Sequence, residues 1–185
     1  MKRCSWADLG SPLYVTYHDE EWGVPSYEDT YLFEMLILES FQAGLSWITI
    51  LKKRENFREA YDAFDVKKVA AYNENKQQEL RNNAGIIRNR LKINASVKNA
   101  NIFIEIQKEF GSFSNYIWSF TDSEIIYGDG QIFHTSTDLS DKISKDLKMR
   151  GMKFVGTTII YAYLQAIGVV NDHSKECYKF VKHGE

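Results

Sequence analysis

The sequence predicts an all-α fold, and three observations lead to that prediction. Apolar residues recur at helical spacing along most of the chain, as Leu32, Met35 and Leu36 illustrate. Only two of the 185 residues are proline, which favours long helices. Ser, Asp and Gly residues flank the periodic segments, where helices begin and end. With 44% apolar content, residues 1–185 can bury one full core, and we expect a single domain with its helices in two lobes.

The first half of the chain predicts an irregular segment followed by helices. Residues 1–25 interleave aromatic and polar side chains and are expected to line a site. A helix with Asp29 at its start and Ser26 as its N-cap follows, and it is expected to run through Ala43 and stop at Gly44. A second helix is expected over 46–63, and Asp65 caps a short third one.

The second half continues the helical pattern around one loop. Its predicted elements, in chain order, are a helix that ends at Gly85, a long amphipathic helix over 86–110 with a break near its start, a helix through Trp118 capped by Ser112, a loop over 121–137 with a turn at 128–130, and helices over 139–149 and 157–167. No repeat, low-complexity tract or linker divides the chain.

The charge balance lacks the strongly basic signature of many nucleic-acid-binding proteins. The net charge is −2 and the isoelectric point is about 6.1. Any contact with nucleic acid would therefore come from local clusters at 52–54, 88–92 and 145–153. No stretch is suited to span a membrane, and the N-terminus leads into no apolar segment typical of a signal peptide, so we expect a cytoplasmic protein.

Two cysteines near opposite ends of the chain each have a histidine nearby. Cys4 precedes His18, and His173 lies four residues before Cys177, which on a helix would place both on one face. Tetrahedral zinc prefers such nitrogen and sulfur donors, so the spacing suggests a zinc ion that joins the termini. A disulfide or two unrelated thiols are the alternatives. Four protein ligands would make the site structural, whereas three with a bound water would suggest a metal hydrolase.

A carboxylate stands in the middle of the first helix's apolar stripe. Glu39 falls among Leu32, Met35, Leu36 and Ala43 on a helical projection. Burying such a group without a partner costs roughly 1–3 kcal/mol, and far more if it stays charged. It either pairs with a core side chain or serves a function.

The residues that follow Glu39 favour a functional pocket. Residues 42–47 predict the end of one helix and the start of the next, with Trp47 just after the new start. A carboxylate and an indole could therefore face one cavity, which would suit a flat, polar heterocycle. A tryptophan at such a position is otherwise more often part of the core.

Two glycine-containing segments are candidates for contact with phosphate. Residues 85–88 join two predicted helices, and a tight hairpin at a helix N-terminus presents free N–H groups to an anion. In residues 153–158 a glycine and two threonines open a helix, and they could cap it without binding any ligand.

Taken together, these segments resemble the DNA-3-methyladenine glycosylase I family, a branch of the helix-hairpin-helix DNA glycosylases. The resemblance covers nearly the whole chain and rests on long ordered motifs: Arg3-Cys4 with Trp6, YHDEEWGVP at 17–25, LFEM at 32–35 leading to Leu38-Glu39, QAGLSWITILKKRE at 42–55, AGIIR at 84–88, KFVGTT at 153–158 and VNDH at 170–173. The chain departs from the family pattern at Ser40-Phe41.

The resemblance implies a fold, a reaction and a set of site residues. It implies a helix-hairpin-helix glycosylase fold whose lobes flank a base pocket, and hydrolysis of the N-glycosidic bond of N3-methyladenine in alkylated double-stranded DNA. The implied roles are as follows: Glu39 acts on the lesion, Tyr17 contacts it, Trp47 stacks on it with Trp6 and Trp22 nearby, Gly85, Ile86, Arg88 and Lys153 contact DNA, and Cys4, His18, His173 and Cys177 hold a structural zinc.

The reaction is expected to stop at an abasic site, because no lysine is singled out for a Schiff base. We expect a monomer as the working form. Two readings from other classes remain. One is a non-catalytic module that binds a free base, a nucleotide or modified DNA in the same pocket. The other is a zinc-containing helical interaction protein, which a fully packed Glu39 with no cavity beside Trp47 would support.

Overall fold

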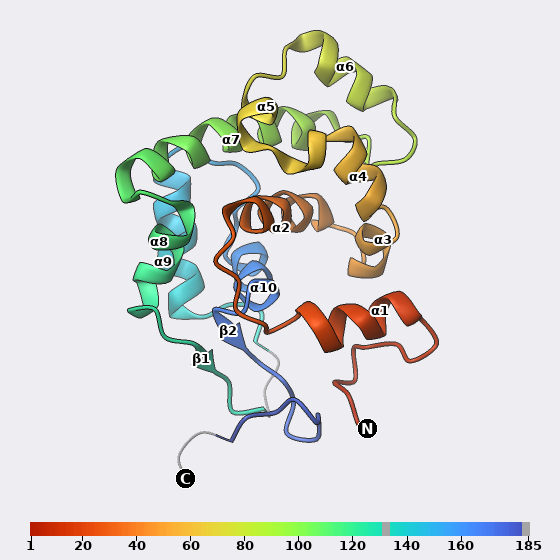
Figure 1. Cartoon of the computed structure of the whole chain (residues 1–185), viewed down its shortest axis with the longest axis vertical. Helices are drawn as coiled ribbons and strands as arrows, with labels where there is room; N and C mark the ends of the chain where they lie inside the picture. The colour runs from red at the N-terminus through yellow and green to blue at the C-terminus, as the bar shows by residue number, and fades with distance from the viewer. Residues whose placement is uncertain (131–133, 183–185) are drawn as a thin grey trace.

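The computed structural model describes residues 1–130 and 134–182, which fold as helices around one buried helix. This helix is α2 (Asp29–Gln42), and every residue from Leu32 to Phe41 is buried. Figure 1 shows α2 at the centre, with α7 (Arg90–Phe110) on one side and α10 (Thr157–Ala166) on the other. Because α2 is covered on all sides, its buried residues are apolar except for Glu34, Glu39 and Ser40, and each of these polar residues needs a partner or a function.

The other elements surround α2. In chain order they are α1 (Pro12–Thr16), the π-helical turn η1 (Tyr17–Glu21), α3 (Trp47–Leu51), α4 (Arg54–Ala60), the 3₁₀ turn η2 (Asp62–Phe64), α5 (Val66–Ala70), α6 (Glu74–Asn82), α8 (Phe113–Trp118), the 3₁₀ turn η3 (Ser119–Thr121), β1 (Ile126–Tyr127), α9 (Asp138–Met149) and β2 (Val170–Asn171). Buried apolar side chains from Cys4 to Cys177 form one connected cluster.

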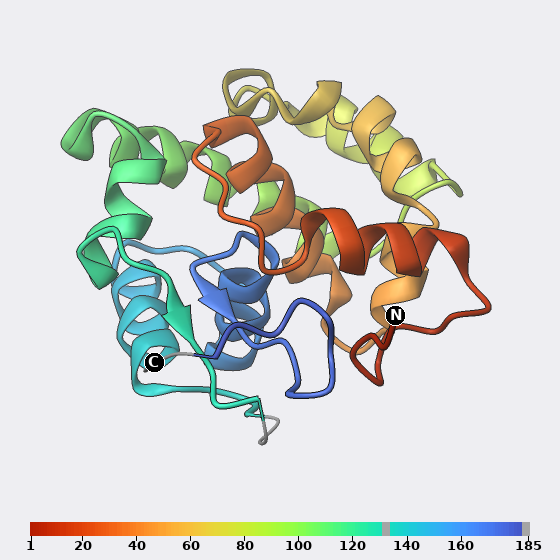
Figure 2. The ribbon, with the colours of Figure 1, turned by 60° about the horizontal axis from the view of Figure 1, so that its bottom comes forward.

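The fold is mostly helical, as predicted, with one small exception. Strands β1 and β2 pair in parallel, Ile126 with Val170 and Tyr127 with Asn171, and Figure 2 shows them side by side. The predicted loop over 121–137 therefore contains a strand, while residues 131–133 of that range lie outside the described part of the chain. Two-residue strands carry too little alternation to be predicted from the sequence.

The prediction of an irregular N-terminal segment was wrong in part. Pro12 occupies the first turn of α1, where its missing N–H is not needed, and the Ser11 side chain caps the helix. The π-helical turn η1 continues directly from α1. The N-terminal segment is thus helical over 12–21 and irregular on either side.

Helix α2 begins at Asp29, as predicted, but its predicted N-cap and the predicted extent of the helix after it were wrong. The N-cap of α2 is Glu28, whereas the carbonyl of Ser26 accepts a hydrogen bond from Trp118 Nε1 at 3.0 Å. The single helix predicted over 46–63 is three elements, α3, α4 and η2. It breaks at Lys53, whose φ and ψ are −105° and 0°, and again at Ala63, which is left-handed.

Helix caps on the far side of α2 were predicted correctly. The Asp65 side chain accepts hydrogen bonds from main-chain N–H groups at the start of α5, and Ser112 does the same for α8. The long helix begins at Arg90, after Asn89 as its N-cap, so the predicted break near its start is a non-helical hairpin over 83–89.

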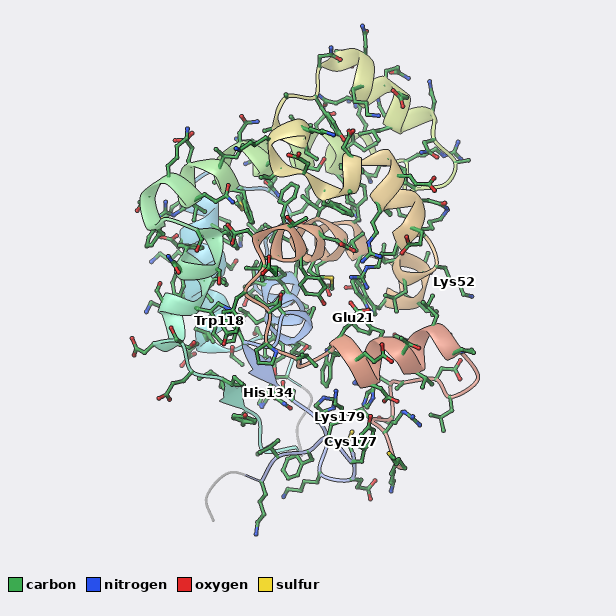
Figure 3. The ribbon with its side chains drawn as sticks, viewed as in Figure 1. Glu21, Lys52, Trp118, His134, Cys177 and Lys179 are labelled. Carbon is green, nitrogen blue, oxygen red and sulfur yellow. The ribbon has the colours of Figure 1, made fainter. Side chains whose placement is uncertain are left out.

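The helical turn predicted for His173 and Cys177 was wrong. Both follow β2 in a segment of turns and irregular backbone. This segment lies against the start of the chain, since the Tyr178 N–H donates to the Lys2 carbonyl and Lys179 Nζ to the Asp19 carbonyl. Figure 3 shows Cys177 and Lys179 at this junction. Among the described residues, no helix is long and apolar enough to cross a membrane.

Candidate active site

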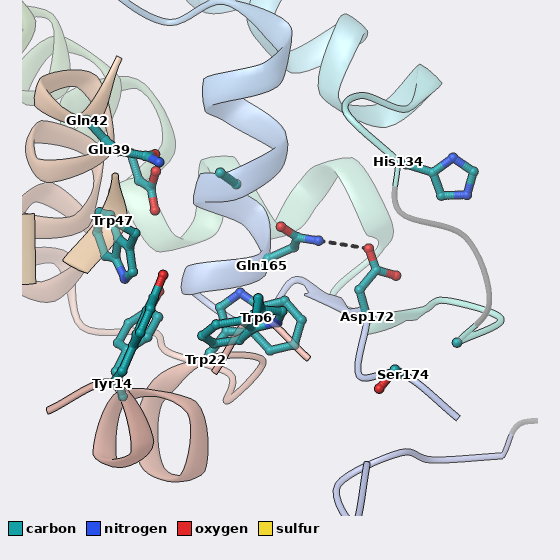
Figure 4. A pocket seen from close by; sticks show the side chains of 13 residues that line it. Trp6, Tyr14, Trp22, Glu39, Gln42, Trp47, His134, Gln165, Asp172 and Ser174 are labelled. Carbon is teal, nitrogen blue, oxygen red and sulfur yellow. Dashed lines mark hydrogen bonds between the residues drawn. The ribbon is translucent and has the colours of Figure 1, made fainter. Parts of the chain in front are cut away.

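A cavity of about 230 Å³ opens beside the C-terminal half of α2. It lies between the N-terminal segment, α2, α3, α10 and the segment around β2 (Figure 4). The described residues that line it are Trp6, Tyr14, Tyr17, Trp22, Glu39, Gln42, Trp47, Gly130, His134, Ala162, Gln165, Asp172 and Ser174. All five residues predicted for a pocket therefore line one cavity, and Glu39 is not packed against solid core.

Aromatic rings form one wall of the cavity. Trp6 contacts both Trp22 and Tyr14 edge to face, with ring centroids 4.9 and 5.4 Å apart. The rings of Tyr17 and Trp47 lie 5.4 Å apart. Flat apolar faces with polar tips suit a planar heteroaromatic ligand.

Glu39 and Trp47 each bring an unpaired polar atom to this cavity. Glu39 is only 3% exposed, and its Oε2 has no hydrogen-bond partner. Burial raises the pKa of the Glu39 carboxyl to about 8, because removal from water penalises the charged form. Trp47 Nε1 is likewise buried without a partner. Such unpaired buried groups are rare in folded proteins and indicate a ligand site.

The opposite end of the cavity carries a second carboxylate that the sequence analysis missed. Asp172 accepts hydrogen bonds from Tyr161 Oη and from Gln165 Nε2, the latter at 2.9 Å (Figure 4). Gln165 and Ala162 share one face of α10, three residues apart. Asp172 was part of a recognised motif, but only its neighbour His173 was assigned a role.

The π-helical turn η1 distributes successive residues to different sites. Tyr17 lines the cavity, His18 joins the cysteine–histidine cluster, and Glu21 accepts two hydrogen bonds from Arg54. An i to i+5 turn carries an extra residue per turn compared with an α-helix, and such turns are frequent at functional sites.

Arg54 was predicted as part of a surface basic cluster, and the structure places it in the interior. Its Nε donates to Glu34 Oε1 at 2.5 Å, and its Nη1 donates to Glu21 Oε2 at 2.7 Å. Both Arg54 and Glu34 are buried. The ion pair therefore connects α4, α2 and η1 behind the cavity wall.

Four buried side chains from the two ends of the chain converge in a second cluster. The ligand atoms of Cys4, His18, His173 and Cys177 all lie within 4.8 Å of one another. Cys177 Sγ is 3.4 Å from His18 Nε2 and 3.5 Å from His173 Nδ1, and Cys4 Sγ is 3.5 Å from the same His173 atom. Both cysteines are free, so the disulfide alternative is not realised.

The surroundings prepare these donors for a cation. Burial lowers the pKa of His173 to about 4 and also lowers that of His18, which keeps both rings neutral. His18 Nδ1 donates to Asp19 Oδ1 at 2.7 Å, which makes Nε2 the acceptor atom of the ring. Nε2 faces the cluster and lies 3.3 Å from the Cys4 main-chain N, which donates to it. The Ser174 N–H points at Cys4 Sγ at 3.4 Å. The four residues could hold a metal ion.

The residues predicted to contact DNA lie apart from the cavity lining. Gly85, Ile86 and Arg88 occupy the hairpin between α6 and α7, with Arg88 exposed and the Ile86 side chain buried in the core. Lys153 is exposed ahead of α10, and its main-chain N–H and carbonyl both bond the Asn99 side chain at 2.9 Å.

The departure from the family pattern does not reach the cavity. Ser40 Oγ donates to the carbonyl of Leu36 at 2.7 Å, and Phe41 packs against Phe57 with centroids 5.0 Å apart. Neither residue is among those that line the cavity.

Comparisons with known proteins find relatives over nearly the whole chain. A sequence model described as methyladenine glycosylase matches residues 6–180. DNA-3-methyladenine glycosylase 1 of Escherichia coli (strain K12) is 48% identical over 180 residues, which cover 96% of each chain. DNA-3-methyladenine glycosylase of Haemophilus influenzae is 44% identical over 178 residues, or 95% of this chain and 96% of the relative.

Solved structures extend the similarity to the fold. A crystal structure of 3-methyladenine DNA glycosylase I superposes with a TM-score of 0.93 at 46% identity, covering 97% of this chain and 100% of that one. The enzyme from Staphylococcus aureus, solved to explain 3-methyladenine recognition, gives a TM-score of 0.93 at 36% identity over 100% of this chain and 99% of that one. The chain belongs to the methyladenine glycosylase family.

Proposed function

We propose that this chain is a DNA repair glycosylase that hydrolyses the N-glycosidic bond of N3-methyladenine in alkylated DNA. The observation that carries this function is a buried, unpaired carboxylate beside an indole in an aromatic cavity. Such a cavity matches a flat, cationic, hydrogen-bonding base. The family and its named relatives act on the same lesion.

The preference for N3-methyladenine over adenine follows from the positive charge of the methylated base. N3-methylation makes adenine cationic within DNA, so the base departs as a neutral molecule and needs no protonation by the enzyme. The Glu39 carboxyl, with a pKa of about 8, is mostly protonated at neutral pH. A cationic base beside Glu39 favours the ionised carboxylate, which then binds that base. Neutral adenine does not ionise Glu39 and so gains no such interaction.

The aromatic residues hold the extruded base. Trp47 stacks on it and adds a cation–π contribution, Tyr17 contacts its edge or orients Glu39, and Trp6 and Trp22 complete the wall. Extrusion costs a few kcal/mol and is cheapest for damaged bases. A water then completes the hydrolysis and leaves an abasic site. A monofunctional reaction fits the cavity, since none of the described residues that line it is a lysine.

The hairpin at 83–89 contacts the DNA backbone. Arg88 and Lys153 offer exposed cations to phosphates. Gly85 and Ile86 form the tip of the hairpin that approaches the DNA backbone, and their main-chain N–H groups hold this tip in shape by donating to Asn83. With a net charge of −2, the chain gains affinity from these local groups and not from its overall field. Binding of double-stranded DNA is therefore weak and sensitive to salt.

Zinc is the metal that best fits the cluster of Cys4, His18, His173 and Cys177. In a tetrahedral zinc site with Zn–S of about 2.3 Å and Zn–N of about 2.1 Å, a sulfur and a nitrogen ligand lie about 3.6 Å apart. The sulfur–nitrogen distances of 3.4–3.5 Å match that edge. Four protein ligands leave no open position, so the ion is structural and takes no part in the hydrolysis.

We further propose that residues 1–185 act as one monomeric domain in the cytoplasm. The single connected hydrophobic cluster supports one domain. Two buried, free cysteines suit a reducing compartment.

The test is release of free N3-methyladenine from methylated duplex DNA. We expect wild type to release the base, and Glu39→Gln to lose at least about a hundredfold in kcat/KM, since an amide cannot supply the anion. Glu20→Gln, an exposed glutamate outside the cavity, is the matched control and should retain activity. Wild type without release, or a fully active Glu39→Gln variant, would contradict the proposal.

A further inference from the structure

The side chain of a lysine near Trp47 donates hydrogen bonds to the main chain of the hairpin at 83–89. Lys53 stands between α3 and α4, and its Nζ donates to the carbonyl oxygens of Ala84 and Gly85, both at 3.1 Å. Asn56 Nδ2 adds a hydrogen bond to the Gly85 carbonyl at 3.2 Å. The segment that follows Trp47 is therefore bonded directly to the tip of the hairpin.

A second lysine makes the reciprocal connection. Lys92 lies in the first turn of α7, just after the hairpin, and its Nζ donates to the carbonyls of Phe41 and Ala43, both at 2.7 Å. Lys92 is buried. The last carbonyls of a helix have no partner within it, and a cation there is doubly favourable. Its two acceptors lie in the segment between Glu39 and Trp47.

These contacts set the two lysines apart from the basic residues around them. Lys52 is exposed and points away from the molecule (Figure 3). Within the described part of the chain, the exposed Arg88 and Arg90 make no side-chain hydrogen bond or ion pair. Arg88 and Arg90 are therefore free to contact phosphate. The Nζ groups of Lys53 and Lys92, in contrast, already donate hydrogen bonds to main-chain carbonyls.

We propose that Lys53 and Lys92 are positioning residues, which fix the hairpin relative to the base pocket and do not act by contacting phosphate. The inference rests on the proposed function, because that function assigns the hairpin to DNA. The extruded base must reach Glu39 and Trp47 while its backbone stays on the hairpin. Small errors in such geometry lower the rate of the chemical step far more than they lower binding.

The test compares Lys53→Met with Lys52→Met, and Lys92→Met with Lys98→Met. The two controls remove exposed lysines from the neighbouring position and from the same helix. Lys53→Arg serves as a rescue, since guanidinium can also donate to carbonyls. Circular dichroism and thermal unfolding confirm that every variant is folded.

Hydrogen exchange measures the connections themselves. We expect Lys53→Met to raise the exchange rate of the amides at 84–89 by about tenfold, and Lys92→Met to do the same at 43–47, with both controls at wild-type rates. Single-turnover release of N3-methyladenine should fall by about tenfold or more in both variants, with partial recovery in Lys53→Arg. Affinity for the free base should stay within about twofold of wild type.

The salt dependence of DNA binding separates positioning from phosphate contact. Loss of a phosphate contact reduces the slope of log K against log salt by about one, which we expect for Arg88→Met and not for Lys53→Met or Lys92→Met. A slope reduced by one in either lysine variant would overturn the proposal. Amide exchange at wild-type rates, or release of N3-methyladenine at wild-type rates, in both Lys53→Met and Lys92→Met would also overturn it. Wild type that releases no base would instead refute the proposed function, and this inference with it.

Discussion

At the scale of single residues, Glu39 shows how function can oppose stability. Its carboxyl is buried without a partner for Oε2, in a wall otherwise made of aromatic rings. The folded protein raises the pKa of this group from an ordinary value of 4.5 to about 8. The unfolded chain therefore loses this proton at lower pH than the folded protein does, and the difference acts against folding.

We predict that Glu39→Gln is more stable than wild type, by an amount that grows with pH. Below about pH 4.5 the carboxyl is protonated in both states and its titration costs nothing. Between about pH 4.5 and 8 the folded state binds more protons than the unfolded state, so the free energy of unfolding of wild type falls, by on the order of 4 kcal/mol across the window.

Urea unfolding of both proteins at pH 5.5, 7 and 8 tests this prediction. The difference between the two proteins isolates Glu39, because all other titrating groups are shared. A difference that does not change with pH would mean that the pKa of Glu39 in the folded protein is close to 4.5, and that the buried carboxyl is ionised at neutral pH.

At the scale of elements, the buried ion pair fixes the turn that carries Tyr17 and His18. Arg54 bridges Glu34 of α2 and Glu21 of η1. Charged groups this deep are not needed for stability, but each depends on its partner once it is buried. The pair therefore holds η1 against α2 and, through η1, holds one wall of the cavity.

We predict that Arg54→Met lowers the free energy of unfolding by about 3 kcal/mol, because it leaves Glu34 buried with one cation fewer. Arg58→Met is the matched control. Arg58 also bonds Glu34, at 3.0 Å from its Nε, but its side chain is 38% exposed, so its loss should cost less than about 1 kcal/mol. If denaturant unfolding showed the same loss of unfolding free energy for both variants, burial of Arg54 would not make its ion pair more important for stability.

The turn after α10 requires a glycine for two reasons. Gly168 has a φ of +74°, and a Cβ built on it would lie 2.2 Å from the carbonyl carbon of Val24 and 2.3 Å from the nitrogen of Pro25. The positive φ would cost most other residues about 1–2 kcal/mol. The close approach of an added Cβ to Val24 and Pro25 would force the backbone to move. This contact seats the N-terminal segment against the start of β2.

We predict that Gly168→Ala destabilises the fold by about 3 kcal/mol or more. Gly44→Ala separates the two causes, since Gly44 also has a positive φ, of +84°, but nothing within 4 Å of an added Cβ. It should cost only about 1 kcal/mol. Similar thermal shifts for both variants would mean that the close contact with the N-terminal segment relaxes at no cost.

At the scale of the whole molecule, the cysteine–histidine cluster joins segments about as far apart in sequence as the chain allows. Cys4 and His18 come from one end, and His173 and Cys177 from the other. Each residue of this cluster except Cys177 lies within two residues of a side chain that lines the cavity, namely Trp6, Tyr17, Asp172 or Ser174. An ion there would order the aromatic wall as well as the termini.

We predict one zinc ion per chain by elemental analysis, and a loss of about 10 °C or more in Tm when a strong chelator removes it. Cys177→Ser, which lacks one ligand, should start at the lower Tm and show little response to the chelator. A wild-type protein that holds no metal, or whose Tm ignores the chelator, would argue that the cluster is only four packed side chains.

Local signals in the sequence predicted what depends on neighbours along the chain. The caps at Asp65 and Ser112, the helix around Glu39, and the new helix start before Trp47 were all confirmed. Each depends on hydrogen bonds and periodicity within a few residues, which the sequence displays directly. The four ligand candidates were also predicted, because zinc prefers cysteine and histidine and the chain has only two cysteines and four histidines.

Tertiary structure decided what depends on segments that meet only after folding. The helix predicted over 46–63 breaks where Arg54 turns inward to Glu34, a partner twenty residues away. His173 and Cys177 meet without the predicted helical turn, because the backbone there is shaped by contact with the N-terminal segment.

The sequence by itself thus determined the helical class, the family and most of the chemistry at the site, since motifs of residue types carry those properties. Only the folded chain decided that Glu39 is unpaired, that Asp172 shares its cavity, and that two lysines face inward. The physical reason is that burial and partnership are properties of the space around a side chain, and distant parts of the chain create that space.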